Sequence, residues 1–402
     1  MSRLSITSRG NRLPGDTEAG EVAYIRTLHT DGSVGRRELD QAPAWQRPST
    51  PLRSRTVYAA AHVVPRIAGD NTPGAPADID WDATLGFRRH LWSWGLGVAD
   101  AMDTAQRNMG LDRRATRDLV TRSAAEARSV GGDLVVGVNT DHVDEPVVDL
   151  DAVIDAYVEQ LHHAEDHGAG VVLMASRHLA RAATGPADYE RVYGEVLDRA
   201  GAPLVLHWLG DAFDPELAGY FGSDEETVLR IIEKNADRVR GIKMSLLDAD
   251  REIALRARLP RGATMFTGDD FHYVDLIEGD GEHHSDALLG AFAAVGPQAA
   301  AAVAALDAGR PEEYRSILGP TETLARHVFA TPTYHYKAGV AFLSWLNGHQ
   351  PAYAMVGGLQ AARSLPHLST LIELADEAGA LEDPDLAARR WNAYLAVHGV
   401  VS

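Results

Sequence analysis

A lysine at the end of a short apolar segment is the residue of this sequence best suited to covalent chemistry. Lys243 lies in the stretch Val-Arg-Gly-Ile-Lys-Met-Ser at 239–245, with a helical pattern on either side. In apolar surroundings the ammonium of a lysine loses solvation and its pKa falls, and the neutral amine can then attack a carbonyl carbon and form an imine. The alternative is a lysine that reaches out from a strand end to make a surface ion pair. The neighbours that the fold gives to Lys243 decide between these two roles.

Polar residues also stand at the ends of the other apolar segments. They are His62; Asp100, Asp103 and Thr104; Asn139, Asp141 and His142; Arg177 and His178; His207 and Trp208; Ser245; Asp269 and Asp270; and Asp286. A carbonyl site with proton transfer needs an amine nucleophile, a base and hydrogen-bond donors for substrate hydroxyls, and these residue types supply all three. If the segments are parallel strands, we expect these residues to converge around Lys243.

Several of these residues have structural alternatives. One of Asp269 and Asp270 is expected to cap the helical pattern that follows, which leaves the other for the site. His207 ends an apolar run and is expected to face the mouth of a barrel, although it could also pack against a neighbouring helix. The adjacent residues His283 and His284 lie in an acidic loop, and we interpret them as solvated rather than as metal ligands.

The elements that must position these residues alternate between strand and helix. Apolar segments occupy 56–63, 96–101, 133–139, 170–175, 202–206, 239–244, 263–268 and 286–291. Helical patterns lie between them at 83–94, 113–129, 150–167, 186–200, 224–237, 248–256 and 270–278. Continuous apolar strands, each followed by a helix, predict an α/β fold of the TIM (β/α)8 barrel type. An open doubly wound sheet is the alternative, but the turn at 63–66 lacks the glycine-rich phosphate loop typical of that fold.

Two further regions flank the predicted barrel of residues 56–308. Residues 1–55 combine β-prone pieces with turn signals such as Thr-Asp-Gly-Ser at 30–33, which predicts an N-terminal hairpin-like extension, with a loosely ordered tail as the alternative. Helical patterns with 3.6-residue apolar spacing occupy 297–307, 311–331, 336–347, 365–379 and 383–398. We therefore expect the last helix of the barrel and then a C-terminal helical subdomain over residues 309–402.

Composition narrows the classes of function. The 402 residues carry a formal net charge of -19, which disfavours nucleic acid and anionic membranes as partners. The absence of cysteine excludes disulfides, thiolate metal sites and cysteine nucleophiles. No apolar run approaches the length of about 18 residues that a membrane span needs, and the first residues show no signal-peptide pattern. We expect a soluble, cytoplasmic protein.

Three segments of the chain occur together, in this order, in one known group of enzymes. They are Gly-Ile-Lys at 241–243, Thr-Gly-Asp-Asp at 267–270, and Phe-Ala-Thr-Pro at 329–332 continuing to Lys-Ala-Gly at 337–339. With the order of elements from about residue 56 to residue 348, they resemble the superfamily of dihydrodipicolinate synthase and N-acetylneuraminate lyase. The resemblance to these class I, Schiff-base aldolases implies the barrel fold and Lys243 as the imine-forming residue; we expect neither a cofactor nor a metal. The resemblance also implies a homodimer or homotetramer.

The chain departs from that superfamily in the substrate pocket. The family binds the carboxylate of a pyruvate-type substrate with a turn of paired threonines, glycine and glutamate, whereas Asp-Thr-Ala-Gln-Arg stands at 103–107 and only Thr104 matches. The family's proton-relaying tyrosine has no counterpart in Ala-Ser-Arg-His at 175–178, and His-Trp-Leu-Gly at 207–210 replaces a tyrosine–asparagine pair. We expect a divergent bacterial branch that kept the amine and changed the pocket.

The leading hypothesis is a cofactor-free lyase, an aldolase or a dehydratase, that forms an imine on Lys243 with a small carbonyl compound. With the tyrosine missing, His207 or His178 is the expected general acid or base. The residues expected to bind the substrate are Thr104, Asp103, Asn139, Arg177 and Asp269. A keto sugar or sugar acid fits this mouth better than pyruvate does.

Two other hypotheses use the same barrel. One is a metal-dependent sugar isomerase or hydrolase, although the close spacings that signal its metal site, such as His-x-His after the first strand, are absent. The other is a barrel that binds a sugar without catalysis.

Overall fold

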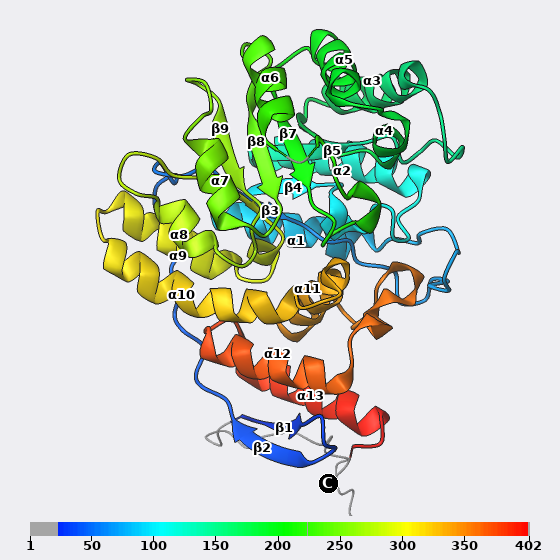
Figure 1. The fold of residues 1–402 in the computed structure, drawn as a ribbon. Helices are drawn as coiled ribbons and strands as arrows, with labels where there is room; N and C mark the ends of the chain where they lie inside the picture. Colours follow the sequence, from blue (N-terminus) through cyan, green and yellow to red (C-terminus); the bar gives the residue numbers. More distant parts are fainter. Residues whose placement is uncertain (1–22, 223, 401–402) are drawn as a thin grey trace, which may run out of the picture.

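The apolar segments form parallel strands that close into a barrel (Figure 1). In the computed structural model, which describes residues 23–222 and 224–400, these strands are β3 (Val57–Ala60), β4 (Gly97–Asp100), β5 (Leu134–Val138), β6 (Gly170–Leu173), β7 (Leu204–Leu209), β8 (Val239–Ser245), β9 (Thr264–Thr267) and β10 (Asp286–Leu289). They pair in chain order, and β10 closes the barrel against β3. The predicted TIM barrel is confirmed, and the open doubly wound sheet is wrong.

The alternation of side chains along each strand places Lys243 inside the barrel. Apolar side chains, among them Tyr58, Val135 and Phe266, fill the interior. Lys243 of β8 pairs with Phe266 of β9, and residues paired across neighbouring strands point to the same face of a sheet. Because Phe266 points inward, Lys243 does so too, near the carboxyl end of its strand.

Helices surround the barrel and connect its strands. In chain order they are α1 (Trp81–Ser93), α2 (Arg113–Val130), α3 (Leu150–Asp166), α4 (Arg177–Ala182), α5 (Pro186–Asp198), α6 (Glu226–Lys234), α7 (Ala249–Arg256), α8 (Tyr273–Glu278) and α9 (Gly296–Asp307). Asp80, Asp112 and Asp149 cap α1, α2 and α3, each accepting a hydrogen bond from a backbone N–H three residues further on. These caps fix the loops that follow the carboxyl ends of the strands. The short helix α4 was not predicted, because six residues show no apolar period.

The predicted C-terminal helices lie over the carboxyl ends of the strands. They are α10 (Pro311–Val328), α11 (Tyr336–Leu346), α12 (Leu365–Glu377) and α13 (Pro384–Val397). In Figure 1 the arrowheads of β7 and β8 point toward α11. The end of the barrel at which such folds carry out chemistry therefore faces the helical region.

The predicted hairpin is present, and it packs against the last helices of the chain. Strands β1 (Tyr24–Leu28) and β2 (Val34–Glu38) pair antiparallel, and both lie beside α12 and α13 in Figure 1. Trp391 Nε1 donates a hydrogen bond to the carbonyl of Arg26 (2.7 Å), and the amide of Asn392 bonds to the backbone of Arg26 and Tyr24 (2.9 Å each). The expectations for residues 1–22 lie outside the described residues and stay predictions.

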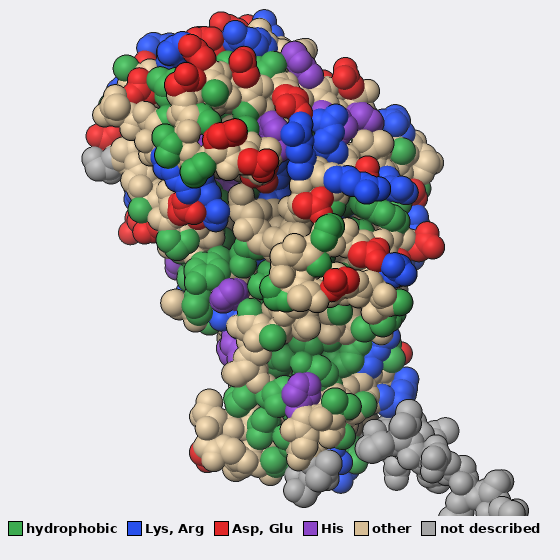
Figure 2. All heavy atoms as spheres, turned by 90° about the vertical axis from the view of Figure 1, so that its right-hand side faces the viewer, with side chains coloured by type: hydrophobic (Ala, Val, Ile, Leu, Met, Phe, Trp, Pro, Cys, Tyr) green, Lys and Arg blue, Asp and Glu red, His purple; other side chains and the backbone are tan. Residues whose placement is uncertain are grey.

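Surface composition differs between the two parts of the molecule. On the face in Figure 2, charged side chains crowd over the barrel, and hydrophobic side chains are more frequent toward the helical region. Among residues 23–222 and 224–400, no helix is both long enough and apolar enough to cross a membrane.

Candidate active site

Lys243 is buried at the mouth of the barrel. The residue is 7% exposed, and its Nζ forms no hydrogen bond or ion pair with any residue that the structure describes. Burial lowers the pKa of Lys243 below its usual range, against the opposing negative charges of Asp103 and Asp270. The surface ion pair considered as an alternative for this lysine is absent from the described part of the chain.

The two neighbouring aspartates after β9 have different roles. Asp269 Oδ1 accepts hydrogen bonds from the backbone N–H groups of Phe271 and His272 (2.8 and 3.1 Å), and Oδ2 contacts the imidazole of His272 (2.9 Å). Asp270 takes one backbone hydrogen bond, from the segment after β10 (2.9 Å). Burial raises the pKa of Asp270 to about 7, although the charge of Lys243 acts in the opposite direction. The N-cap of α8 is His272 and no side chain caps it, so the expected capping role of one aspartate is wrong. Asp269 instead holds the turn that precedes α8, and Asp270 is the carboxylate that lies near Lys243.

Glycine is required beside the lysine stem. A Cβ atom at Gly268 would lie 2.7 Å from Lys243 Cε and 2.1 Å from Ser245 Oγ. Both distances are well inside van der Waals contact, so any larger residue at this position would displace the amine. The Thr-Gly-Asp-Asp segment that carries the family resemblance therefore has a steric reason for its glycine.

His207 lies next to Lys243 across the β7–β8 pair. Its Nε2 is 3.2 Å from Ser245 Oγ, and its Nδ1 has no partner among the described residues. Burial, together with the nearby positive charge of Lys243, lowers the pKa of His207 well below its usual range. The imidazole of His207 is thus buried and neutral beside the stem of Lys243.

A tyrosine from the helical region completes the mouth. Tyr336, the first residue of α11, has its hydroxyl 2.7 Å from Thr104 Oγ1. Burial raises the pKa of Tyr336 well above its usual range, so this hydroxyl stays protonated. The ring stacks on Phe329 with 4.3 Å between centroids, which fixes its orientation. Thr104, predicted as a substrate ligand, thus positions a phenol at the open end of the barrel.

A second buried lysine follows that tyrosine. Burial lowers the pKa of Lys337 to about 8, opposed by the charges of Asp103 and Asp214. Its Nζ donates one hydrogen bond, to the carbonyl of Tyr334 (3.1 Å), which leaves two N–H groups. Arg177 lies nearby, with its Nε bonded to Asp214 (2.7 Å). Asp103 and Arg177, both predicted for substrate binding, therefore share their surroundings with Lys337.

Two of the predicted site residues are held by other contacts. His178 Nδ1 lies 2.8 Å from Thr140 Oγ1, and its Nε2 lies 2.9 Å from the carbonyl of Glu145. Both ring nitrogens are therefore occupied, the second one as a donor. The side chain of Asn139 donates to the carbonyl of Ala175 (3.2 Å) and accepts from the N–H of Thr140 (2.7 Å). These contacts tie the loops after β5 and β6 together, and they occupy both ring nitrogens of His178.

Other polar residues at strand ends stabilise the barrel. Asp100 forms a fully buried ion pair with Arg88 (2.8 Å), and Asp141 accepts a hydrogen bond from Arg107 Nε (2.8 Å). A buried charge is tolerated only when it is paired in this way. The mouth therefore contains fewer free groups than the sequence predicted.

A hollow of about 410 Å³ opens at the opposite end of the barrel. Its polar lining includes Arg55, Asp133 and Arg240, and the hydroxyl of Tyr58 bonds to the last two (2.7 and 3.1 Å). In barrels of this type the amino ends of the strands serve stability and the carboxyl ends carry the chemistry. We therefore place the candidate site at Lys243.

Comparison with models of known protein families identifies the family of this chain. A family model described as "Protein of unknown function (DUF993)" matches residues 25–400. The chain belongs to DUF993. A search of curated proteins found no match to it.

The fold of this DUF993 chain is similar to that of solved dihydrodipicolinate synthases. The enzyme from Thermotoga maritima is 16% identical with a TM-score of 0.61, over 81% of this chain and 100% of that chain. The enzyme from Aquifex aeolicus is 13% identical with a TM-score of 0.62, over 81% and 99%. A prophage protein of the dihydrodipicolinic acid synthase family from E. coli K12, in complex with pyruvate, is 15% identical with a TM-score of 0.60, over 81% and 98%. At these identities the likeness shows the barrel fold.

The sequence alone did not identify three residues at the mouth of this DUF993 barrel. The Thr-Gly-Asp-Asp segment does not show which of its two aspartates lies near Lys243, and Tyr336 and Lys337 lie in a helical region without a strand-end signal. The one available signal was the Pro-to-Lys segment of the family resemblance, which contains both Tyr336 and Lys337. That segment shows where these residues lie in the chain, but not that α11 crosses the barrel mouth.

Proposed function

We propose that this protein is a Schiff-base-forming lyase, an aldolase or a dehydratase, in which Lys243 condenses with a keto sugar or sugar acid. The observation that carries the proposal is the amine of Lys243, which is buried at the barrel mouth, has a lowered pKa and is unbonded among the described residues. An amine in this state can be neutral at working pH and attack a carbonyl carbon. The fold that the chain shares with dihydrodipicolinate synthases supports the same chemistry.

Asp270 is the proposed proton acceptor for imine formation. The nitrogen of Lys243 forms a bond to the carbonyl carbon, and the carbonyl oxygen leaves as water after it has gained two protons. A carboxyl group with a pKa of about 7 can take a proton from the amine and return it to the oxygen, because both forms are populated near neutrality. In the aldolase, the protonated imine draws in the electron pair of the C–C bond beyond the α carbon, and the bond breaks to leave an enamine and an aldehyde. In the dehydratase, a base first removes the α proton to form the enamine, whose electron pair then expels the β hydroxyl, and this hydroxyl leaves as water once it has gained a proton.

The hydroxyl pair of Tyr336 and Thr104 is proposed to move protons to and from the substrate. Two hydroxyls 2.7 Å apart can pass a proton along their hydrogen bond. Tyr336 would then be the general acid or base, the role for which the sequence predicted His207 or His178. His207 is assigned a positioning role, since it contacts Ser245 beside the lysine stem.

Lys337 and Arg177 favour a sugar acid over a neutral keto sugar. The two spare N–H groups of Lys337 lie in a buried setting, where a charged hydrogen bond to a carboxylate is worth more than in water. Asp103, which is only partly buried beside them, is placed to accept hydrogen bonds from substrate hydroxyls. We further expect a cytoplasmic homodimer or homotetramer.

Trapping the imine tests the proposal. The full-length protein would be incubated with pyruvate, dihydroxyacetone or 2-keto-3-deoxygluconate and then reduced with borohydride. We expect the intact mass to rise by the carbonyl compound less one water plus two hydrogens, with the modification mapped to Lys243. The Lys243→Ala variant should give no adduct, whereas Lys337→Ala, the matched buried lysine, should still be modified.

Two results would contradict the proposal. Turnover that a chelator abolishes, without any reducible adduct, would favour the metal-dependent isomerase or hydrolase. Binding of a sugar acid with neither adduct nor turnover would favour the non-catalytic barrel.

A further inference from the structure

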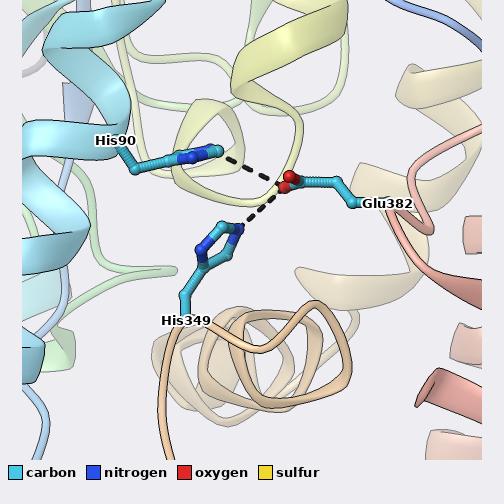
Figure 3. Close-up of side chains that lie close together, drawn as sticks. All are labelled: His90, His349 and Glu382. Carbon is cyan, nitrogen blue, oxygen red and sulfur yellow. Dashed lines mark hydrogen bonds and ion pairs between the residues drawn. The ribbon is translucent and has the colours of Figure 1, made fainter.

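Two histidines and a glutamate from three separate segments meet outside the Lys243 site. His90 lies in the last turn of α1, His349 follows α11, and Glu382 lies between α12 and α13. Figure 3 shows both imidazoles directed at the carboxylate. Oε1 of Glu382 is 2.7 Å from His349 Nε2 and 3.6 Å from His90 Nε2. One ligand atom from each residue lies within 4.8 Å of the other two.

These distances are close to those of a metal site. Zn²⁺ binds histidine nitrogens at about 2.0–2.1 Å and carboxylate oxygens at about 2.0–2.2 Å with tetrahedral geometry, which separates the ligand atoms by about 3.4 Å. The distance of 3.6 Å from His90 to Glu382 already fits this value. The shorter contact of His349 needs to open by less than about 1 Å, which a small rotation of the glutamate side chain provides.

The backbone around two of the three ligands is fixed by hydrogen bonds. The side-chain amide of Asn347 accepts from the N–H of Glu382 (3.0 Å) and donates to the carbonyl of Ala380 (2.8 Å). The N–H of His349 donates to the carbonyl of Ser344 (2.9 Å). A site held in this way loses little conformational freedom when an ion binds.

The aromatic ring of Phe87 orients the two imidazoles. Its centroid lies 6.0 Å from that of His90, with the rings nearly parallel, and 5.5 Å from that of His349. Because Phe87 belongs to α1, the barrel supplies both a ligand and the surface against which the second imidazole packs. The three groups therefore converge through packing from both parts of the molecule.

A buried hydroxyl beside the three ligands points to a further bound species. Ser344 is 3% exposed, and its Oγ has no hydrogen-bond partner among the residues that the structure describes. It lines the same cavity as His90, His349 and Glu382, and the cavity volume of about 10 Å³ is that of a single water molecule. A water bound to a metal ion there would complete its coordination and give Ser344 a partner.

We propose that His90, His349 and Glu382 bind a divalent transition metal, and that Zn²⁺ is the ion that this ligand set fits best. Two imidazoles, one carboxylate and a water are a set that zinc adopts in proteins. The three ligands come from separate segments of the chain, so we assign the ion a structural role. The ion would join α1 of the barrel to the segments that follow α11 and α12. This inference does not depend on imine chemistry at Lys243.

Cobalt is the probe for this site, because Co²⁺ occupies zinc sites and absorbs visible light strongly when it is four-coordinate. We expect one equivalent of Co²⁺ to give this spectrum with metal-free, full-length protein, and Zn²⁺ to displace it. Glu382→Gln and His349→Gln should each weaken the affinity by about 100-fold or more, since one of three protein ligands is lost. Zn²⁺ should raise the Tm of the wild type but not that of the variants. His283→Gln, which changes an exposed histidine, should behave like the wild type.

Several results would overturn the proposal. Glu382→Gln keeps the backbone hydrogen bond to Asn347, so we expect this variant to fold. Circular dichroism of the metal-free variant checks its fold. If it does not fold, His90→Gln is the second variant to test. Equal Co²⁺ affinity in the wild type and a folded variant would place the metal elsewhere. No spectrum at millimolar Co²⁺ would show that the cluster binds none. Stability that depends on Glu382 but not on Zn²⁺ would identify a histidine–glutamate ion pair in its place.

Discussion

Two buried lysines face the same barrel mouth, and their surroundings differ. Lys337 Nζ donates to the carbonyl of Tyr334 (3.1 Å) and lies 4.5 Å from the centroid of the Tyr336 ring. Lys243 has no such partner among the described residues, and burial lowers the pKa of both lysines. A carbonyl oxygen and the face of an aromatic ring both stabilise an ammonium ion. The difference assigns bond formation to Lys243 and the binding of an anion to Lys337.

The largest difference should appear when each lysine is replaced by methionine, which keeps the length of the apolar stem. With 2-keto-3-deoxygluconate as the probe, Lys243→Met should reduce kcat/KM by about 10³-fold or more, because the covalent intermediate is lost. Lys337→Met should raise KM by about 10-fold to 100-fold and still form the reducible adduct. Steady-state kinetics and borohydride trapping measure both effects. An adduct that survives in Lys243→Met and disappears in Lys337→Met would reverse the assignment.

Crowding the stem of Lys243 should be the next most damaging change. Gly268→Ala places a methyl group 2.7 Å from Lys243 Cε, so we expect adduct formation to slow by about 100-fold and the free energy of unfolding to fall by about 1–3 kcal/mol. Gly194→Ala is the matched control, because no atom lies within 4 Å of its added methyl group in α5. The control should be neutral or stabilising by about 0.5–1 kcal/mol. Urea unfolding and trapping rates measure these effects, and equal rates in both variants would contradict the steric argument.

Removing either hydroxyl of the Tyr336–Thr104 pair should have a smaller effect, which appears in kcat and not in KM. Tyr336→Phe removes the group bonded to Thr104 and should lower kcat by about 10-fold to 100-fold with little change in KM. The imine should still form, because Lys243 and Asp270 are untouched. Thr104→Val should have a weaker effect of the same kind, since the phenol remains but is no longer oriented. A change confined to KM would show that Tyr336 binds substrate and moves no proton.

The smallest effect concerns a buried glutamate outside the barrel mouth, where burial changes stability and not catalysis. Glu252 of α7 accepts hydrogen bonds from Ser285 (2.7 Å) and Thr267 (3.0 Å), and burial raises its pKa to about 8. The folded protein keeps this proton at pH values above 4.5, the ordinary pKa of a glutamate, where the unfolded chain loses it. The resulting stability is fully present below that pH and is lost as the pH rises through about 8.

A variant that cannot ionise tests this linkage. Glu252→Gln should flatten the decline in stability between about pH 5 and pH 9 by on the order of 1–2 kcal/mol. Denaturant unfolding at several pH values measures it. An unchanged slope would show that the carboxyl of Glu252 titrates normally in the folded protein.

The barrel could be predicted from the sequence because its strands are continuous apolar runs. Each run is buried on both faces, and capping residues such as Asp112 and Asp149 mark where the following helices begin. The helix α4 escaped prediction because it is short, and its His178 was therefore assigned to the mouth instead of to the contacts with Thr140 and Glu145.

The candidate site was harder to predict from the sequence, because its residues come from distant parts of the chain. Lys243 was found because a lysine that ends an apolar strand is conspicuous. The choice between Asp269 and Asp270 depends on which carboxylate reaches the backbone of the next turn, and the sequence does not show this. The positions of Tyr336 and His349 depend on how the helical region docks on the barrel, and no local spacing encodes that arrangement.

The hairpin of β1 and β2 has a consequence for the order of events during synthesis. Its backbone at Arg26 bonds to Trp391 and Asn392, which the ribosome adds about 365 residues later. Strands β1 and β2 therefore stay without these partners until α13 has left the exit tunnel of the ribosome. Nascent chains stalled before α13 should expose this hairpin to proteases, whereas in the folded protein α13 packs against it.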